Sequence, residues 1–321
     1  MQTLADPIPL AEIRAARERI AGTVLHSPLI RLNVDNAPAE IYLKLENLQP
    51  IGSFKLRGAG NAILLAPPEQ LKAGVYTASA GNMAQGVAWH ARRLGIPCTV
   101  IVPDDAPQTK LDAITRLGGQ IIKISHDDWW QIIVTHHFEG VPGLFVHPVS
   151  DLAVIAGNGT IGLEILEDLP DVEAVVIPYG GGGLSTGIAS AIRALKPDTR
   201  LYAAEVETSA ALSVALAAGE IRPFNYQSSF VDGIGSSSVL ADMWPRVQAL
   251  LDGSLVSSLH EVAAAIRLIA ERNRVIAEGA GAASVAAALA GKAGHGKVVC
   301  VVSGGNIDAA KLTKIFRGEM E

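Results

Sequence analysis

Short apolar runs rich in β-branched residues alternate with helix-like segments from about residue 75 to the end of the chain. Strands that are apolar at consecutive positions are buried on both faces, as they are in parallel sheets covered by helices. The sequence therefore predicts an α/β protein with open, mostly parallel sheets. The runs expected to form strands are 73–79, 98–103, 120–124, 174–178, 200–205 and 297–303.

Composition limits the class of protein. The 321 residues can form two domains of ordinary size, and 49% hydrophobic with 18% charged residues excludes a disordered chain. The net charge of −6 and the absence of a basic block argue against nucleic acid as a partner. Cys98 and Cys300 lie in apolar runs, so we expect buried thiols and a reducing compartment. No signal peptide or membrane-spanning stretch is recognisable, which predicts a soluble, cytoplasmic protein.

The segment Ser53–Ala59 places Lys55 at the start of a helical pattern, between apolar residues and glycine. A lysine is unfavourable beside the positive end of a helix, but this placement suits an amine that must be neutral and nucleophilic. The alternative is a surface lysine on a first helical turn. Lys55 is therefore a candidate for covalent catalysis.

A second loop, Ser79–Asn82, lies between an expected strand and an expected helix. Small residues followed by Asn at a helix N-terminus offer several N–H donors, which suits a carboxylate. An ordinary helix cap is the alternative interpretation.

The run Gly180–Gly183 follows one expected strand and precedes a helix. Four glycines lose much chain entropy on ordering, and their N–H groups can approach a phosphate closely. The run matches neither G-x-G-x-x-G nor the P-loop pattern. Glu205, about twenty residues on, stands where a ribose-binding acid would lie, so a dinucleotide site stays open as an alternative.

A fourth loop, Ser303–Asn306, again leads from strand to helix. Alone it indicates a common connection with an Asn cap. Ligand sites in open parallel sheets gather at the carboxyl ends of strands. The four loops together therefore predict one site for an anionic ligand.

These motifs resemble the pyridoxal-phosphate serine/threonine dehydratases of the tryptophan-synthase-β fold (fold type II), which include serine racemase. The resemblance runs from about Ile13 to Phe316. The motifs that carry it are S-F-K-L-R-G-A, T-A-S-A-G-N, H-P followed by A-V-I-A-G-N-G-T, the four glycines and S-G-G-N. The resemblance implies a lyase (ammonia-lyase) that uses pyridoxal 5'-phosphate in amino-acid catabolism. It would convert a β-hydroxy amino acid of the L-threonine or L-serine type, or a bulkier one such as phenylserine, to a 2-oxo acid and ammonia.

The family's roles can be assigned to matching positions in this sequence. Lys55 would hold the cofactor as a Schiff base and, once freed, remove the Cα proton as general base. The other cofactor contacts would be Phe54, Asn82, Gly180, Gly181, Gly182, Gly183, Leu184 and Ser303. The substrate contacts would be Ser79, Ala80, Gly81, Asn82 and Met83. Ser303 would face the pyridine nitrogen. Because a hydroxyl group, unlike a carboxylate, does not favour a protonated ring, the carbanion would be poorly stabilised and the β-hydroxyl group would be lost promptly.

Three positions depart from the family pattern. Ala80 replaces the serine that serves serine racemases as the opposite-face acid and base, so we expect negligible racemisation. Met83 replaces a frequent histidine, which indicates either a pocket for a larger β-substituent or simple packing in the helix. Glu205, with the Ser209 carbonyl, matches only part of a cation site, because the usual second carboxylate falls at Ala211.

Two further groups allow more than one interpretation. Glu278 matches a family glutamate near the ring edge but is equally consistent with a helix-opening acid. The histidines His126, His136 and His137 are too irregularly spaced for a metal site and are interpreted as surface residues.

The resemblance also implies how the chain is divided. Residues 69–147 would form a smaller domain, inserted in a larger one of residues 1–68 plus 148–321, with the cofactor between them. A homodimer is expected by analogy. The alternatives are a β-replacement enzyme or an amino-acid racemase of the same fold, a dinucleotide-dependent oxidoreductase, and a catalytically silent binding module.

Overall fold

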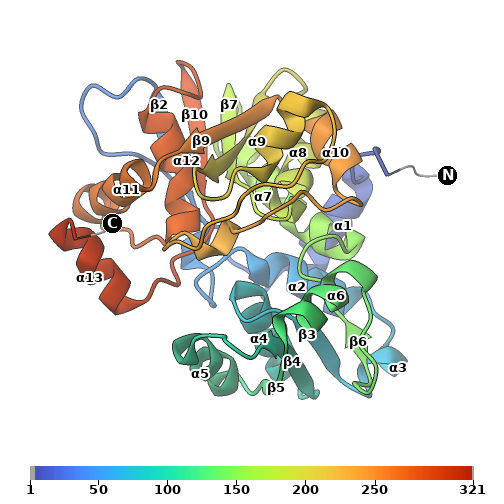
Figure 1. Cartoon of the computed structure of the whole chain (residues 1–321). Helices are drawn as coiled ribbons and strands as arrows, with labels where there is room; N and C mark the ends of the chain where they lie inside the picture. Colours follow the sequence, from blue (N-terminus) through green and yellow to red (C-terminus); the bar gives the residue numbers. More distant parts are fainter. Residues whose placement is uncertain (1–3, 320–321) are drawn as a thin grey trace.

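The computed structural model describes residues 4–319 and contains two sheets, each covered by helices (Figure 1). The six-stranded sheet has the order β1-β2-β10-β7-β8-β9, and every neighbouring pair is parallel except β1 with β2. This confirms the expected α/β class. Its strands are β1 (Leu29–Arg31), β2 (Glu40–Leu45), β7 (Ala174–Pro178), β8 (Arg200–Val206), β9 (Gly253–Ser257) and β10 (Lys297–Val302).

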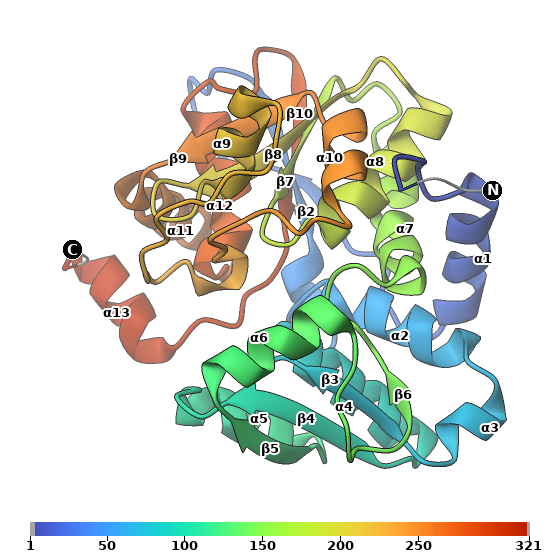
Figure 2. The same ribbon diagram turned by 45° about the vertical axis from the view of Figure 1, so that its right-hand side comes forward.

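The four-stranded sheet is wholly parallel, with the order β5-β4-β3-β6. Its strands and helices all come from one stretch of chain, which lies below the larger sheet in Figures 1 and 2. They are β3 (Val75–Ala78), α4 (Asn82–Leu94), β4 (Cys98–Pro103), α5 (Gln108–Arg116), β5 (Gln120–Ile124), α6 (His126–Thr135) and β6 (Leu144–Phe145). This stretch falls inside the range 69–147 expected for the smaller domain. The domain boundaries themselves stay a prediction, and residues 1–3 and 320–321 of the larger range lie outside the described residues.

The other helices come from the two flanking parts of the chain. They are α1 (Leu10–Ile20), η1 (Glu46–Leu48), α2 (Lys55–Leu65), α3 (Pro68–Leu71), α7 (Leu152–Asp168), α8 (Gly183–Leu195), α9 (Ala211–Ala218), η2 (Asp232–Ile234), α10 (Trp244–Leu250), α11 (Leu259–Asn273), α12 (Gly279–Leu289) and α13 (Ala309–Arg317). Helix α2 packs against both α7 and α4, so it joins the two halves of the molecule.

Both sheets are buried on both faces, as the apolar runs predict. In β10, Val298 and Cys300 pack with α11 and α12, whereas Val299 and Val301 pack with α7 and α8. The smaller sheet shows the same alternation, because successive residues of β3 and β4 belong to different core clusters. Two-sided burial explains why most positions of these strands, and not only alternate ones, are apolar.

Two sequence expectations can be checked directly. Cys98 and Cys300 are free and buried, at 4% and 0% exposure. Among residues 4–319, no helix has the length and apolar character required to cross a membrane.

Candidate functional site

One large cavity of about 960 Å³ lies where the carboxyl ends of β3, β7 and β10 meet the start of α2. Every candidate cofactor or substrate residue proposed from the sequence lines it, apart from the cation ligands. They are Phe54, Lys55, Ser79, Ala80, Gly81, Asn82, Met83, Gly180, Gly181, Gly182, Gly183, Leu184 and Ser303. Parallel strands end at the same edge of a sheet, which is why loops far apart in the sequence meet here.

Lys55 is the first residue of α2 and is half-buried at the edge of the cavity. Its Nζ donates a hydrogen bond to the Pro148 carbonyl across 2.6 Å and lies 5.2 Å from the centre of the Phe54 ring. Burial disfavours the charged form and lowers the pKa of Lys55 to about 8. The neutral form of the amine, which a nucleophile or base requires, is therefore far more accessible near neutral pH than in an ordinary lysine.

The loop after β3 places Asn82 at the start of α4 with both ends of its side-chain amide engaged. Its Nδ2 donates to Glu278 Oε1 across 2.8 Å, and its Oδ1 accepts from Asn306 Nδ2 across 2.8 Å. The Ser79 N–H donates to the Ile101 carbonyl and the Gly81 N–H to the Ser79 hydroxyl. One proton of Nδ2 and the N–H groups of Ala80 and Asn82 remain available to a ligand in the cavity.

Glu278 stands at the N-cap position of α12 but makes no side-chain cap hydrogen bond. Its carboxylate turns instead to Asn82 and lines the cavity. Burial, reinforced by the charge of Asp232, raises the pKa of Glu278 to about 7. Glu278 is therefore a helix-opening acid by its position in the chain, and its carboxyl group also faces the cavity.

The glycine loop joins β7 to α8, with Gly182 at φ +95° in the left-handed region. A Cβ at Gly183 would lie 2.4 Å from the Val149 carbonyl oxygen, and one at Gly181 would lie 2.7 Å from the Val149 methyl groups. Side chains are thus excluded from the loop, whose amides line the cavity at the positive end of α8. This geometry fits a phosphate group.

Ser303 follows β10 and is 3% exposed. Its carbonyl accepts the Phe54 N–H across 3.0 Å, which ties the fourth loop to the residue before Lys55. The Ser303 hydroxyl makes no hydrogen bond to another residue in the described part of the chain, so it is available to a group in the cavity.

The candidate cation ligands lie elsewhere. The Glu205 carboxylate accepts hydrogen bonds from the Leu212 and Ser213 amides and from the Ser254 hydroxyl, at 2.6–2.8 Å. The Ser209 hydroxyl contacts the backbone carbonyls of Ile234, in η2, and of Ser236. Within residues 4–319 no group of three or more His, Cys, Asp or Glu side chains could hold a metal ion. The cation stays a prediction without structural support.

A buried charge cluster beneath Lys55 was not predicted from the sequence. The guanidinium of Arg57, fully buried on α2, bonds both oxygens of Glu46 and both oxygens of Glu164 at 2.6–2.9 Å. Lys44 Nζ lies 2.8 Å from the same Glu164. Burial opposes the charge of Arg57, but the two carboxylates outweigh it and raise the pKa. The only sequence signal was the arginine in S-F-K-L-R-G-A, which gave no hint of its partners.

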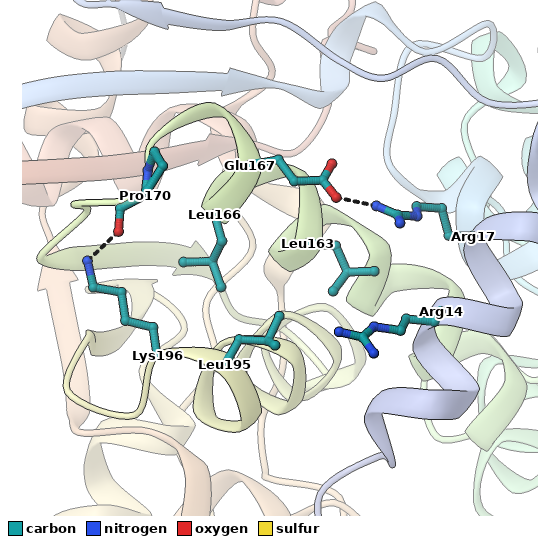
Figure 3. A pocket seen from close by; sticks show the side chains of 8 residues that line it. All are labelled: Arg14, Arg17, Leu163, Leu166, Glu167, Pro170, Leu195 and Lys196. Atoms are coloured by element: carbon teal, nitrogen blue, oxygen red, sulfur yellow. Dashed lines mark hydrogen bonds and ion pairs between the residues drawn. The ribbon is translucent and has the colours of Figure 1, made fainter.

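A second hollow, shown in Figure 3, lies on the outer surface between α1, α7 and α8. Two of its polar side chains are paired with other residues of its lining: Arg17 pairs with Glu167, and Lys196 donates a hydrogen bond to the Pro170 carbonyl. It contains none of the candidate site residues, so the cavity at Lys55 is the candidate active site.

Comparison with known protein families matches residues 20–304 to the family described as "Pyridoxal-phosphate dependent enzyme". The L-threonine ammonia-lyase of Thermotoga maritima is 40% identical over 314 residues, which cover 96% of this chain and 78% of that protein. The catabolic L-threonine dehydratase TdcB of Escherichia coli K12 is 36% identical over 317 residues, which cover 96% of both chains.

Solved structures are similar over nearly the whole chain. Maize serine racemase superimposes with a TM-score of 0.88 at 31% identity, covering 98% of both chains. The processed threonine deaminase isoform 2 of Solanum lycopersicum also gives 0.88, at 33% identity, covering 96% of this chain and 86% of that one. The two-sheet architecture is therefore shared with proteins whose names denote different reactions.

Proposed function

The chain belongs to the pyridoxal-phosphate dependent enzymes, and from this premise we propose that it is a dehydratase that converts a β-hydroxy amino acid to a 2-oxo acid and ammonia. The observation that carries the proposal is that the Lys55 amine, with its pKa lowered to about 8, shares one cavity with a glycine-lined anion cradle. The names of the relatives from Thermotoga maritima and Escherichia coli support the same reaction type.

The cavity residues fit the cofactor of this family. The amides of Gly180–Gly183 and Leu184 would hold its phosphate, and the Ser303 hydroxyl would meet the ring nitrogen. Phe54 would lie beside the ring, and the second Nδ2 proton of Asn82 would reach the ring oxygen. When bound, pyridoxal phosphate supplies an aldehyde for a lysine and a ring that takes up electron density from the amino acid's α-carbon.

The chain's own groups then act on the substrate. The loop Ser79–Asn82 binds the carboxylate through the Ser79 hydroxyl and the loop amides that have no partner in the protein, which fixes the orientation of the Cα–H bond. The neutral amine of Lys55 takes the Cα proton as general base. The Pro148 carbonyl holds that amine beside the cavity whenever the amine is free.

The identity of the β-substituent belongs to the proposal. Trp129, Trp130 and Phe230 line the cavity, which gives it apolar walls suited to a substituent larger than the methyl group of threonine. Met83 is 1% exposed and packs in the core of the smaller sheet, yet it also reaches the cavity. Met83 therefore packs in the helix and also forms part of the cavity wall.

The test is a screen for release of a 2-oxo acid from threonine, serine, hydroxyaspartate and phenylserine, in both enantiomers. We expect product from at least one of them, and less than about a hundredth of that turnover from Lys55→Ala. Borohydride reduction followed by peptide mapping is expected to find a pyridoxyl group on Lys55. A cofactor-saturated preparation without that adduct would refute the assignment.

Three further parts of the proposal concern organisation. Residues 69–147 form the smaller domain, with the cofactor between it and the larger one, which limited proteolysis can test. The enzyme is a cytoplasmic homodimer, which light scattering and cell fractionation can test. A cation at Glu205 and Ser209 is tested by assay after treatment with a chelator.

A further inference from the structure

Pro148 and Val149, in the segment that follows β6, contact both essential parts of the cavity. Lys55 Nζ donates to the Pro148 carbonyl across 2.6 Å. The next residue, Val149, lies so close to the glycine loop that a Cβ at Gly183 would be 2.4 Å from its carbonyl oxygen. The conformation of this short segment therefore determines where the amine and the cradle lie relative to each other.

His147 precedes this segment, and its buried imidazole holds the segment in place. Its Nδ1 accepts the N–H groups of Val149 and Ser150, across 3.1 and 2.8 Å. Its Nε2 lies 3.1 Å from the carbonyl oxygen of Ile133, in α6. One side chain thus closes the turn after Pro148 and connects that turn to a helix of the smaller sheet.

The partners define the protonation state of the ring. Two N–H donors point at Nδ1, so Nδ1 carries a lone pair, and the carbonyl opposite Nε2 requires the proton there. A proton on Nδ1 would face two other donors. Burial, the nearby His136 and the amine of Lys55 disfavour a charged ring, whereas the Ile133 carbonyl and the carboxylate of Asp242 favour it. Burial dominates, and the pKa of His147 is lowered to about 4.

We propose that His147 is a positioning residue, a neutral acceptor that shapes the turn 148–150 so that Pro148 meets the Lys55 amine and Val149 supports the glycine loop. It does not touch the reacting atoms. Its influence on the cofactor rests on the proposed function, whereas its tautomer and hydrogen bonds do not.

A neighbouring histidine provides a matched control. The ring of His136 stacks on His147 with centroids 4.1 Å apart, and its side chain is 44% exposed. Its Nε2 lies 3.3 Å from the Ser150 hydroxyl, which also lies 3.1 Å from His147 Nδ1, but His136 makes no hydrogen bond to the turn amides. Its φ of +59° is tolerated by asparagine, so His136→Asn removes the stacking ring and leaves the acceptor of His147 in place.

Two substitutions distinguish the roles of the two ring nitrogens of His147. In His147→Asn the amide oxygen can occupy the place of Nδ1 and accept from the turn, whereas in His147→Gln the amide reaches the place of Nε2 and the turn loses its acceptor. In the full-length protein, we expect His147→Gln to bind pyridoxal phosphate about tenfold more weakly than the wild type. His147→Asn and His136→Asn are expected to stay within about threefold of the wild type.

Equal affinity in His147→Gln and the wild type would overturn the proposal, as would an equal loss in the two folded His147 variants. A second measurement does not depend on any variant. Nitrogen NMR of the full-length protein with labelled histidine should show His147 as the Nε2–H tautomer, unchanged between about pH 6 and 8. An Nδ1–H tautomer or a charged ring would overturn the proposal even if the cofactor assignment is correct. Failure of the wild type to bind the cofactor, with the expected tautomer observed, would instead count against the proposed function alone.

Discussion

The side-chain amide of Asn82 donates a hydrogen bond to the carboxylate of Glu278 across 2.8 Å, which joins the first turns of α4 and α12. These helices belong to different sheets. Burial and the charge of Asp232 raise the pKa of Glu278 to about 7, above its usual value of 4.5. The carboxyl group is therefore less easily ionised in the folded protein than in the unfolded chain.

This difference predicts how stability depends on pH. Between about pH 4.5 and 7 the folded state binds more protons at Glu278 than the unfolded state, so this residue's contribution to stability falls as the pH rises. Glu278→Gln keeps an acceptor for Asn82 and removes the charge. We expect the variant to be more stable than the wild type by about 1–3 kcal/mol at pH 8 and to show no gain near pH 4.5. Urea denaturation of cofactor-free protein at the two pH values checks this, and an equal effect at both would contradict it.

The contact between Gly183 and Val149 predicts a steric effect on the anion cradle. Gly183→Ala would place a methyl group 2.4 Å from a backbone oxygen, which cannot move without shifting the turn after Pro148. We expect a loss of about 1–3 kcal/mol in stability and weaker binding of pyridoxal phosphate. Gly81→Ala is the control, since a Cβ there meets nothing within 4 Å, and its unfolding midpoint should match the wild type. A fully stable Gly183→Ala protein would show that the loop is less tightly packed than described.

The fully buried Arg57 predicts a strong dependence of stability on one side chain. Arg57→Met leaves the carboxylates of Glu46 and Glu164 without their shared cation, at an expected cost of about 3–5 kcal/mol. Arg57→Lys should not restore stability, because one ammonium group cannot make bidentate hydrogen bonds to both carboxylates. Denaturant titration measures these changes.

The control for Arg57 is an arginine near the surface. Arg193 pairs with Asp252 at 22% and 40% side-chain exposure, so removing that ion pair by Asp252→Asn should cost about 1 kcal/mol or less. Similar losses at the two sites would mean that burial does not control the strength of the Arg57 cluster.

The methyl side chain of Ala80 leads us to expect that the enzyme does not racemise its substrate. It lines the cavity with a methyl group, which cannot carry a proton to the opposite face of the substrate. We expect negligible incorporation of solvent deuterium at the α-position of D-serine, and an increase of about tenfold or more in Ala80→Ser. Mass spectrometry of the recovered amino acid provides the measurement. Ready exchange by the wild type would show that another group supplies the second proton.

Much of the fold could be predicted because the pattern is local. The runs 98–103, 120–124 and 174–178 are β4, β5 and β7 to the residue, since continuous apolar β-branched sequence leaves few alternatives. Helix ends carry local signals as well: Ser258 and Glu261 form a capping box at the start of α11, and Gly95 ends α4 at φ +66°.

The strands that were missed have weaker local signals. Strand β2 contains Lys44, which is fully buried because Glu164, far along the chain, neutralises it. A lysine in a short run indicates an exposed segment unless that distant partner is known. Strand β6 has two residues and pairs only with β3, so it carries almost no pattern.

The loops of the site were predicted together because each has its own small-residue signal and parallel strands bring their ends to one edge. His126, His136 and His137 are exposed, as expected. The contact of the Pro148 carbonyl with Lys55 could not be predicted, because every residue has a backbone carbonyl and the sequence does not show where it points. The role of His147 could not be predicted either, because it depends on which hydrogen-bond donors the fold places beside its ring. The orientation of the Glu278 side chain toward Asn82 could not be predicted from the sequence, because it too depends on a partner that the fold brings close.

The inaccessibility of both native thiols has a practical consequence. Burial raises the pKa of Cys98 to about 12 and disfavours ionisation of Cys300 as well, so neither side chain forms the thiolate on which alkylation depends. A reporter cysteine can then be introduced on the surface of the smaller sheet without first removing the natural ones. Fluorescent labelling of the otherwise unaltered enzyme would allow the separation of the two sheets to be followed while substrate is turned over.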